Sequence, residues 1–326
     1  MGVIVHSNIQ SIFNKVIRYL SRWRAYLVLI LTFVIASIFT PYFFNYYNLA
    51  SVLSGATIIG VIGCGMTVAI IVADLDLSVG AVAGFSAVLM GSLLMWGVPL
   101  PLAIIIGLIT SLIIGFISGI ITVKIGINPI IATLGMLFLV NGLELLISGE
   151  NVIRVDNPGL FFLGTTNIVG FPILFIILIG IFLTYYFIAH FTKYGRFLYS
   201  TGTNLQAAKL SGVEVDLVKI SGFMLSALTA AIGGIFILAR DSSAQVLAGN
   251  PYLLRSAAAY FLGNALFDSE KPLFKGTVVG ALLISVIRNA LTLSRVSVEI
   301  IRILEGGILI IAVALTIYFG GQRINK

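Results

Sequence analysis

Hydrophobic residues in this chain form long, nearly uninterrupted runs rather than an alternating pattern. A bilayer core of about 30 Å is crossed by about 20 apolar residues in a helix. The strands of a membrane barrel are shorter and alternate between apolar and polar residues, which these runs do not. The pattern therefore predicts an all-α polytopic membrane protein with about ten transmembrane helices. The expected spans are 25–44, 50–72, 79–96, 100–123, 129–148, 171–190, 216–238, 252–267, 274–293 and 298–319.

Most segments outside these runs are short, except for two long connections, an outer one at 149–170 and an inner one at 191–215. Residues 1–24 place apolar side chains at helical spacing with basic residues elsewhere on the helix, which predicts an amphipathic segment on the cytoplasmic face. The following run is too long for the apolar part of a cleaved signal peptide. We expect a single transmembrane domain over 25–320 and a cytoplasmic tail at 321–326. No internal repeat is visible in the sequence.

The composition supports a membrane protein and argues against nucleic-acid binding, a metal site and a catalytic triad. Of 326 residues, 59% are hydrophobic and 10% are charged, whereas about a quarter of a soluble domain is charged. A net charge of +7 raises the possibility of nucleic acid, but the basic residues lie in short connections, as expected for loops that face anionic lipid. One cysteine and two histidines leave little material for a disulfide, a metal site or a catalytic triad.

Lysine and arginine are distributed unevenly between alternate connections. With the N-terminus inside, only three basic residues fall in outer connections, namely Arg154, Arg240 and Arg295. The inner segments hold Lys15, Arg18, Arg22, Arg24, Lys124, Lys193, Arg196, Lys209, Lys219, Lys271, Lys275, Arg323 and Lys326. This asymmetry predicts that both termini are cytoplasmic.

The inner connection 191–215 contains a short helical pattern. Thr203 or Asn204 can cap a helix over Leu205–Ser211, and Gly212 can end it. A helix of two turns is not stable alone in water, so it needs a packing partner. Either the transmembrane helices of this chain or a separate cytoplasmic subunit can supply that partner.

Three segments carry a resemblance to a known family: DLDLSVGAVAG at 74–84, INPIIATLGMLFLVNGL at 127–143, and KYGRFLYSTGTNLQAAKLSGVEVDLVK at 193–219. Together they resemble the membrane permease subunits of bacterial ABC importers for monosaccharides of the ribose, arabinose and galactose type. The resemblance covers roughly residues 40–318. Two departures stand out. Ala73 and Asp74 occupy positions where the family usually has two glycines, and a glycine-rich stretch of the family retains only Gly263 and Gly276 here.

The resemblance implies a fold, partners and a docking element. The fold would resemble the vitamin-B12-type permeases, in the inner membrane of a prokaryote. A second permease subunit would complete the pathway, a periplasmic or lipoprotein sugar-binding protein would deliver substrate, and a cytoplasmic ATPase would use the ATP. No cofactor would be bound by this chain, which also lacks a Walker-type phosphate loop. The helix that couples to the ATPase would comprise Asn204, Leu205, Gln206, Ala207, Ala208, Lys209, Leu210, Ser211 and Gly212.

Several polar residues in or near the spans are candidates for gating or for lining the pathway. Asp76 and Ser78 lie where one span ends and the next begins, so they cap a helix, act in gating, or contact the ATPase. Asn128 is placed to cap a helix that begins at proline. Thr133 and Asn141 lie two turns apart on one helix. They either bond neighbouring helices or line the sugar pathway, for which neutral side chains that donate and accept are suited.

A group of charged residues lies in the outer halves of the last two spans: Arg288, Glu299, Arg302 and Glu305. We interpret it as a structural ion network in which Arg288 pairs with Glu305, with ion coupling as the alternative. An ion-coupled secondary transporter would need carboxylates near the membrane midplane, and most acids here lie at loops or span ends. The leading prediction is therefore a sugar permease, with a nucleoside or a branched-chain amino acid as the alternative substrate. We expect neither enzymatic activity nor binding of nucleic acid.

Overall fold

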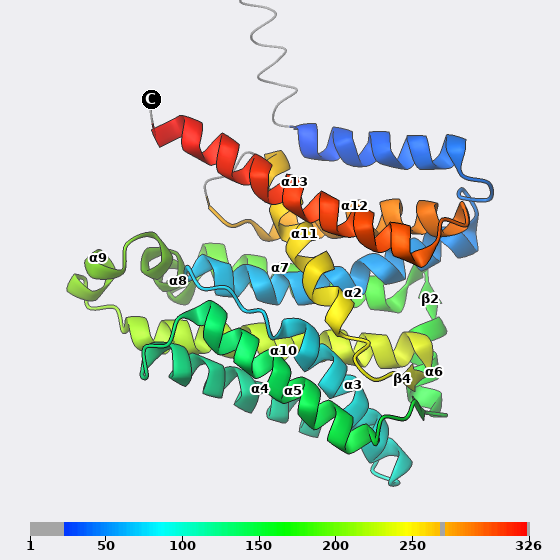
Figure 1. The fold of residues 1–326 in the computed structure, drawn as a ribbon, viewed down its shortest axis with the longest axis horizontal. Coiled ribbons are helices and arrows are strands. Elements are labelled where there is room, and N and C mark those ends of the chain that lie inside the picture. Colours follow the sequence, from blue (N-terminus) through cyan, green and yellow to red (C-terminus); the bar gives the residue numbers. More distant parts are fainter. Residues whose placement is uncertain (1–22, 268–270, 325–326) are drawn as a thin grey trace, which may run out of the picture.

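The computed structural model describes residues 23–267 and 271–324, and it is a bundle of long helices (Figure 1). The amphipathic segment expected at 1–24 lies almost entirely outside the described residues. The long helices are Trp23–Phe39, α2 (Tyr46–Ile71), α3 (Val79–Met95), α4 (Leu100–Val123), α5 (Pro129–Ser148), α7 (Ile173–Phe191), α10 (Val215–Asp241), α11 (Asn250–Phe267), α12 (Phe274–Leu293) and α13 (Val298–Ile324).

Within these described residues, six helices are long and apolar enough to cross a membrane, namely α2, α4, α5, α7, α10 and α12. This confirms a helical protein with several membrane spans. Trp23–Phe39 and α3 are apolar but shorter. The long axis of the molecule separates two ends (Figure 1). We call one the α9 end, where α8 (Lys193–Thr203) and α9 (Leu205–Leu210) lie, and the other the β4 end, where α6 (Pro158–Thr165) and β4 (Ser243–Ala244) lie.

Local chemistry explains where several helices begin and end. The side chain of Asn128 accepts a hydrogen bond from the amide of Ile130, and Pro129 occupies the first turn of α5, which confirms the predicted cap. The first span was predicted to run to residue 44, but its helix ends at Phe39. The reason is Pro41, because the residue before a proline is disfavoured in helical geometry.

The segment 149–170 is more structured than its composition predicts. It contains the helix α6, in which the side chain of Asn157 accepts from the amides of Gly159 and Leu160. It also contributes β1 (Ile153–Arg154), which pairs antiparallel with β4, and part of a small hairpin of β2 (Asn167–Ile168) and β3 (Phe171–Pro172). This segment therefore covers the β4 end of the bundle (Figure 1).

The helices form two inverted repeats, which the sequence does not reveal. The order α2, connection 72–78, α3, α4, α5 recurs as α10, connection 242–249, α11, α12, α13. The contacts repeat as well, because α2 packs on α12 as α10 packs on α4, and α3 packs on α5 as α11 packs on α13. In Figure 1 α2 and α10 run in opposite directions. Inverted repeats of this kind are common in membrane transporters.

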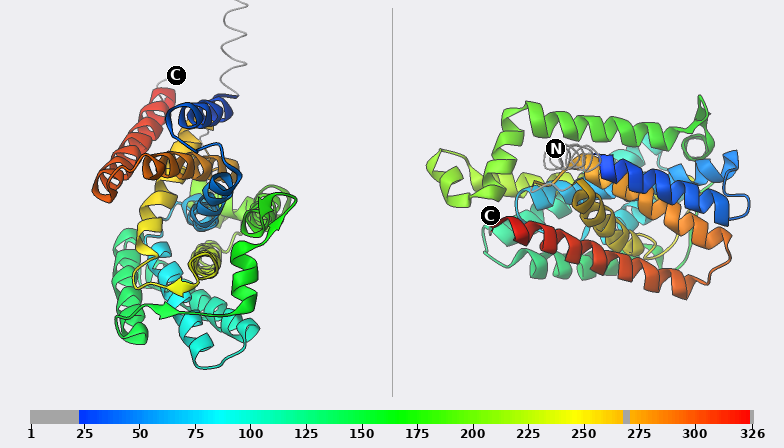
Figure 2. Two further views of the ribbon diagram at one scale, coloured as in Figure 1. Left: turned by 90° about the vertical axis from the view of Figure 1, so that its right-hand side faces the viewer. Right: turned by 90° about the horizontal axis from the view of Figure 1, so that it is seen from above.

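The two repeats meet where α3 and α11 begin. A Cβ atom added to Gly249 would lie 2.1 Å from the carbonyl oxygen of Gly80 and 2.4 Å from the amide nitrogen of Gly84. Only glycine permits this approach, since any side chain would collide with backbone. The short helices α3 and α11 are thereby held against each other at the centre of the bundle. Helix α2 and helix α10 are the most buried spans, whereas α7 lies at the edge of the bundle in both views of Figure 2.

Candidate functional site

Helix α9 projects from the bundle as the outermost element of the α9 end (Figure 1). The side chain of Asn204 accepts a hydrogen bond from the amide of Ala207 at 3.0 Å, and Gly212 follows with a φ of +79°. The predicted cap, helix and stop are all confirmed. Of the six helical residues only Ala208 is buried, and Leu210 is 90% exposed. Helix α9 therefore packs on its own chain through Ala208 alone, and its other five residues are exposed.

Helix α8, which the sequence analysis did not predict, is the platform for α9. Its Tyr194 hydroxyl lies 2.6 Å from Ser221 Oγ on α10, and its Tyr199 hydroxyl donates to the carbonyl of Pro272 at 2.9 Å. Near its end, Gly202 packs on the last turn of α2, where an added Cβ would lie 1.8 Å from the carbonyl oxygen of Ile71. Contacts with α10, with Pro272 and with α2 thus fix the position of α8. Because α9 follows α8 after one residue, these contacts also determine where α9 lies.

The connection 72–78 begins directly after this contact with α2. It contains two of the predicted site residues, Asp76 and Ser78, and accepts a hydrogen bond from a third, Thr133. The amide and the hydroxyl of Ser78 donate to Asp76 Oδ1 at 2.9 and 2.6 Å, and Ser226 Oγ on α10 donates to Oδ2 at 2.8 Å. The Thr133 hydroxyl on α5 donates to the carbonyl of Leu75 at 3.2 Å. Asp76, Ser78 and Thr133 therefore meet at one place, where they tie the connection to α5 and α10.

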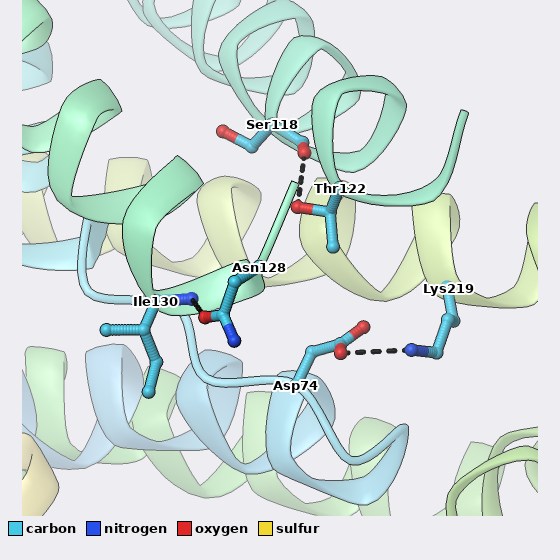
Figure 3. A network of polar contacts seen from close by, with 6 residues as sticks. All are labelled: Asp74, Ser118, Thr122, Asn128, Ile130 and Lys219. Atoms are coloured by element: carbon cyan, nitrogen blue, oxygen red, sulfur yellow. Dashed lines mark hydrogen bonds and ion pairs between the residues drawn. The ribbon is translucent and has the colours of Figure 1, made fainter. Parts of the chain in front are cut away.

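A buried ion pair joins the same connection to α10. Lys219 Nζ lies 3.0 Å from Asp74 Oδ1, and the two side chains are 19% and 2% exposed. Figure 3 shows them pointing toward each other, with Asn128 on the nearby start of α5. Asp74 occupies one of the positions where the resembling family usually has glycine, and Ala73 beside it has a φ of +62°. This chain therefore keeps the backbone shape that suits glycine and adds a charge pair.

Replacing Lys219 with glutamine is expected to lower the free energy of unfolding by about 3 kcal/mol, because it leaves the Asp74 carboxylate buried without its partner. Lys124→Gln is the matched control, since its ion pair with Asp216 is exposed at 58% and 41%, and such pairs contribute under about 1 kcal/mol. Adding Asp74→Gly to Lys219→Gln should restore most of the loss. Thermal unfolding of the detergent-solubilised protein measures all three, and equal losses for Lys219→Gln and its control would contradict the assignment.

The remaining predicted pathway residue, Asn141, lies apart from this group. It lies two turns beyond Thr133 on α5, and its Oδ1 is buried without a hydrogen-bond partner. One turn further, Glu144 is fully buried and accepts from the amide of Leu247 at 2.7 Å, while its Oε2 has no partner. Leu247 belongs to the connection that precedes α11. Glu144 thus ties α5 to the second inverted repeat.

In the charged group near the β4 end, the closest ion pair is not the predicted pair of Arg288 and Glu305. Arg255 Nε on α11 lies 2.9 Å from Glu305 Oε1, whereas Arg288 Nη1 lies 3.9 Å from the same oxygen. Arg255 also lies over the ring of Tyr252, 5.3 Å from its centroid. Glu299 and Arg302 lie on the exposed face of α13, away from this pair. The structure therefore joins two arginines to one glutamate.

Comparison with protein families finds a match over most of the chain. Residues 48–313 match the family described as "Branched-chain amino acid transport system / permease component". The chain belongs to this permease family.

The permease also has similar curated proteins. It is 32% identical over 311 residues to the ribose import permease protein RbsC of Haemophilus influenzae, which covers 94% of this chain and 96% of that protein. It is 34% identical over 292 residues to the ribose import permease protein RbsC of Bacillus subtilis, covering 89% and 91%. The fructose import permease protein FrcC of Rhizobium meliloti is 30% identical over 282 residues, covering 84% and 78%. These relatives confirm the resemblance that the three sequence segments carry. No solved structure matches the chain.

Several residues of the permease site escaped the sequence analysis: Lys219, Ser226, Glu144 and Arg255. Each of them bonds to a segment distant in the sequence, by between 50 and 150 residues. Spacing along one helix carries no signal for such pairs. Their presence inside apolar runs was the available clue, because a polar or charged side chain in a span is costly unless it has a partner.

Proposed function

We propose that this permease is the membrane subunit of an ABC importer for a monosaccharide. It would cross the membrane ten times with both termini in the cytoplasm, in a fold of the vitamin-B12 permease type. It would work with a second permease subunit, a cytoplasmic ATPase that uses ATP, and an extracytoplasmic sugar-binding protein. The observation that carries the proposal is α9, because a capped helix with Leu210 almost fully exposed has the geometry of a docking element.

The structure offers a route by which movement of α9 would reach the bundle. Helix α9 follows α8 after one residue, and α8 packs through Gly202 on the last turn of α2. The connection 72–78 begins there and is bonded to α10 through Asp74 and Asp76. A displacement of α8 would therefore be passed to the start of α3, at the junction of the two repeats. We propose Asp76, Ser78 and Thr133 as parts of this gate.

A sugar fits this chain better than an amino acid for two reasons. The relatives named above are ribose and fructose import permeases, although the family description names branched-chain amino acids. The predicted pathway residues Thr133 and Asn141 are neutral side chains of the kind that pair with sugar hydroxyls, and the Asn141 oxygen, which is buried without a partner here, would accept from a sugar once the pathway opens. A zwitterionic amino acid would need charged partners in the pathway instead.

Uptake by right-side-out vesicles loaded with ATP tests the substrate. Vesicles that contain the permease with its ATPase and binding protein are expected to take up labelled ribose or fructose when ATP is supplied on the cytoplasmic side. Leucine and adenosine serve as the competing substrates. Uptake that follows an imposed ion gradient without ATP would contradict the proposal, and uptake of leucine alone would reassign the substrate.

The proposed topology predicts opposite accessibility at two exposed positions. Cysteines at Val152, which is 56% exposed near β1, and at Gln206 on α9 should react with an impermeant thiol reagent from opposite sides of the membrane. The native Cys64 is fully buried, so its replacement by serine removes background at little cost. Labelling of both positions from outside intact cells would contradict a cytoplasmic α9.

A further inference from the structure

A cavity of about 340 Å³ lies at the α9 end between the last turn of α7, helix α8 and the start of α12. It is lined by Ala189, His190, Arg196, Tyr199, Lys271 and Leu273. Among its lining side chains, three carry a full charge or gain one on protonation, and all three are basic. None of the proposed transport steps uses this cavity. Its volume falls at the lower end of the range for small-ligand sites, about 300–1,000 Å³.

Hydrogen bonds hold two side chains of the cavity wall, Tyr199 and His190, in place. The Tyr199 hydroxyl donates to the carbonyl of Pro272, and burial raises the pKa of Tyr199 to about 12, so that this hydroxyl remains protonated. His190 Nδ1 lies 3.0 Å from the carbonyl of Tyr186, which orients the ring and leaves Nε2 for another partner. Arg196 is exposed on α8. Lys271 has further contacts of its own, so the argument rests on Arg196 and His190.

An apolar stripe follows one face of α7 and ends at Phe191, the residue after His190 of the cavity lining. Leu183, Phe187 and Phe191 lie four residues apart on one face of the helix and are 55%, 58% and 65% exposed. Figure 2 shows α7 at the edge of the bundle, where lipid chains would contact it. In the proposed topology the cavity lies at the cytoplasmic surface of the membrane. A basic recess of this kind above an apolar stripe has the shape of a phospholipid, with a headgroup site and an acyl-chain surface.

We propose that this cavity binds the phosphate of an anionic phospholipid, with its acyl chains along α7. Arginine suits a phosphate because its planar fork forms two parallel hydrogen bonds with two oxygens. His190 Nδ1 already donates to the carbonyl of Tyr186, so the ring adds a second donor through Nε2 when the imidazole is protonated. A neutral sugar would gain nothing from this set of charges. The lipid would also contact α8, and so would stabilise the platform on which α9 stands.

Native mass spectrometry of the full-length permease, with lipid titrated in, tests the site. Phosphatidylglycerol is expected to bind more tightly than phosphatidylcholine, and Arg196→Gln should weaken phosphatidylglycerol binding about fivefold, the effect of losing one basic contact with an anionic headgroup. The control is Lys193→Gln, which removes an equal charge from the same helix at a position that does not line the cavity. Because both side chains are exposed, neither change should unfold the protein.

Each other outcome overturns the proposal. An equal loss in Lys193→Gln would mean diffuse attraction to the surface rather than a site. Displacement of the lipid by millimolar glycerol phosphate, with no preference between phosphatidylglycerol and phosphatidylcholine, would reassign the cavity to a soluble phosphate. Loss of lipid binding when the ATPase is added would show that protein covers the cavity. Sugar transport does not enter these readouts, so they are independent of the proposed function.

Discussion

Replacing Leu210 with aspartate is expected to reduce ATP-driven uptake by at least tenfold while leaving the permease folded in the membrane. Leu210 is 90% exposed and is the most exposed large apolar side chain of α9. In the proposed complex it would enter a groove of the ATPase. Truncating a hot-spot residue at the centre of an interface costs about 2 kcal/mol or more, and a buried carboxylate would add its own desolvation cost. Co-purification of the ATPase and uptake into vesicles measure the two consequences.

Ile125→Asp is the matched control for this experiment. Ile125 is 66% exposed in the connection between α4 and α5, so the same change is made at the α9 end but on a different element. Ala208, in contrast, is a poor probe although it lies in the same helix, because its side chain is 3% exposed and packs inward. An arginine at that position would distort α9 itself. If Leu210→Asp retains both the bound ATPase and uptake, α9 is not the docking element.

The sequence predicted α9 well because every signal for it is local. The Asn204 cap, the short apolar and polar pattern and Gly212 all lie within nine residues, and the structure places each as expected. The start of α5 at Pro129 was predictable for the same reason. The early end of the first span at Phe39 also follows from one neighbouring residue, Pro41, whose effect on the preceding backbone was overlooked.

The inverted repeat was hidden because it is a property of packing rather than of residue identity. The two halves use different residues for equivalent purposes, such as Asp76 with Ser226 in one connection and Leu247 with Glu144 in the other. Glycines mark the close approaches between the two halves, at the junction of α3 and α11 and also where Gly65 and Gly234 lie between α10 and the helices α2 and α3. A single sequence contains many such glycines, so it cannot show which of them face each other.

The charged group near the β4 end shows which contacts helical spacing can predict and which it cannot. The sequence predicts that Arg288 pairs with Glu305, and the structure places Arg288 Nη1 3.9 Å from Glu305 Oε1. The nearer partner, Arg255, lies on α11, and no spacing argument along α12 and α13 can identify it. Its side chain is 9% exposed, whereas that of Arg288 is 41% exposed. Burial therefore indicates that Arg255 and Glu305 form the stronger pair.

Glu305→Gln is accordingly expected to cause the largest loss of stability among single changes in this group, about 3–5 kcal/mol, because it leaves the buried guanidinium of Arg255 without a carboxylate. Arg288→Gln should cost much less, and Glu299→Gln should have no measurable effect because Glu299 is fully exposed. Double-mutant cycles separate the two pairs, with a coupling energy of about 1–3 kcal/mol between Arg255 and Glu305 and a smaller one between Arg288 and Glu305.

Exchanging the charges distinguishes Arg255 from Arg288 as the principal partner of Glu305. Arg255→Glu combined with Glu305→Arg keeps opposite charges at the two positions that form the 2.9 Å pair and should restore part of the stability lost in either single variant. Arg288→Glu combined with Glu305→Arg should not, because the new arginine would then face Arg255 at the shorter of the two distances. Thermal unfolding in detergent measures both exchanges under the same conditions. Rescue by the Arg288 exchange alone would mean that Arg288, rather than Arg255, is the principal partner of Glu305 in the folded permease.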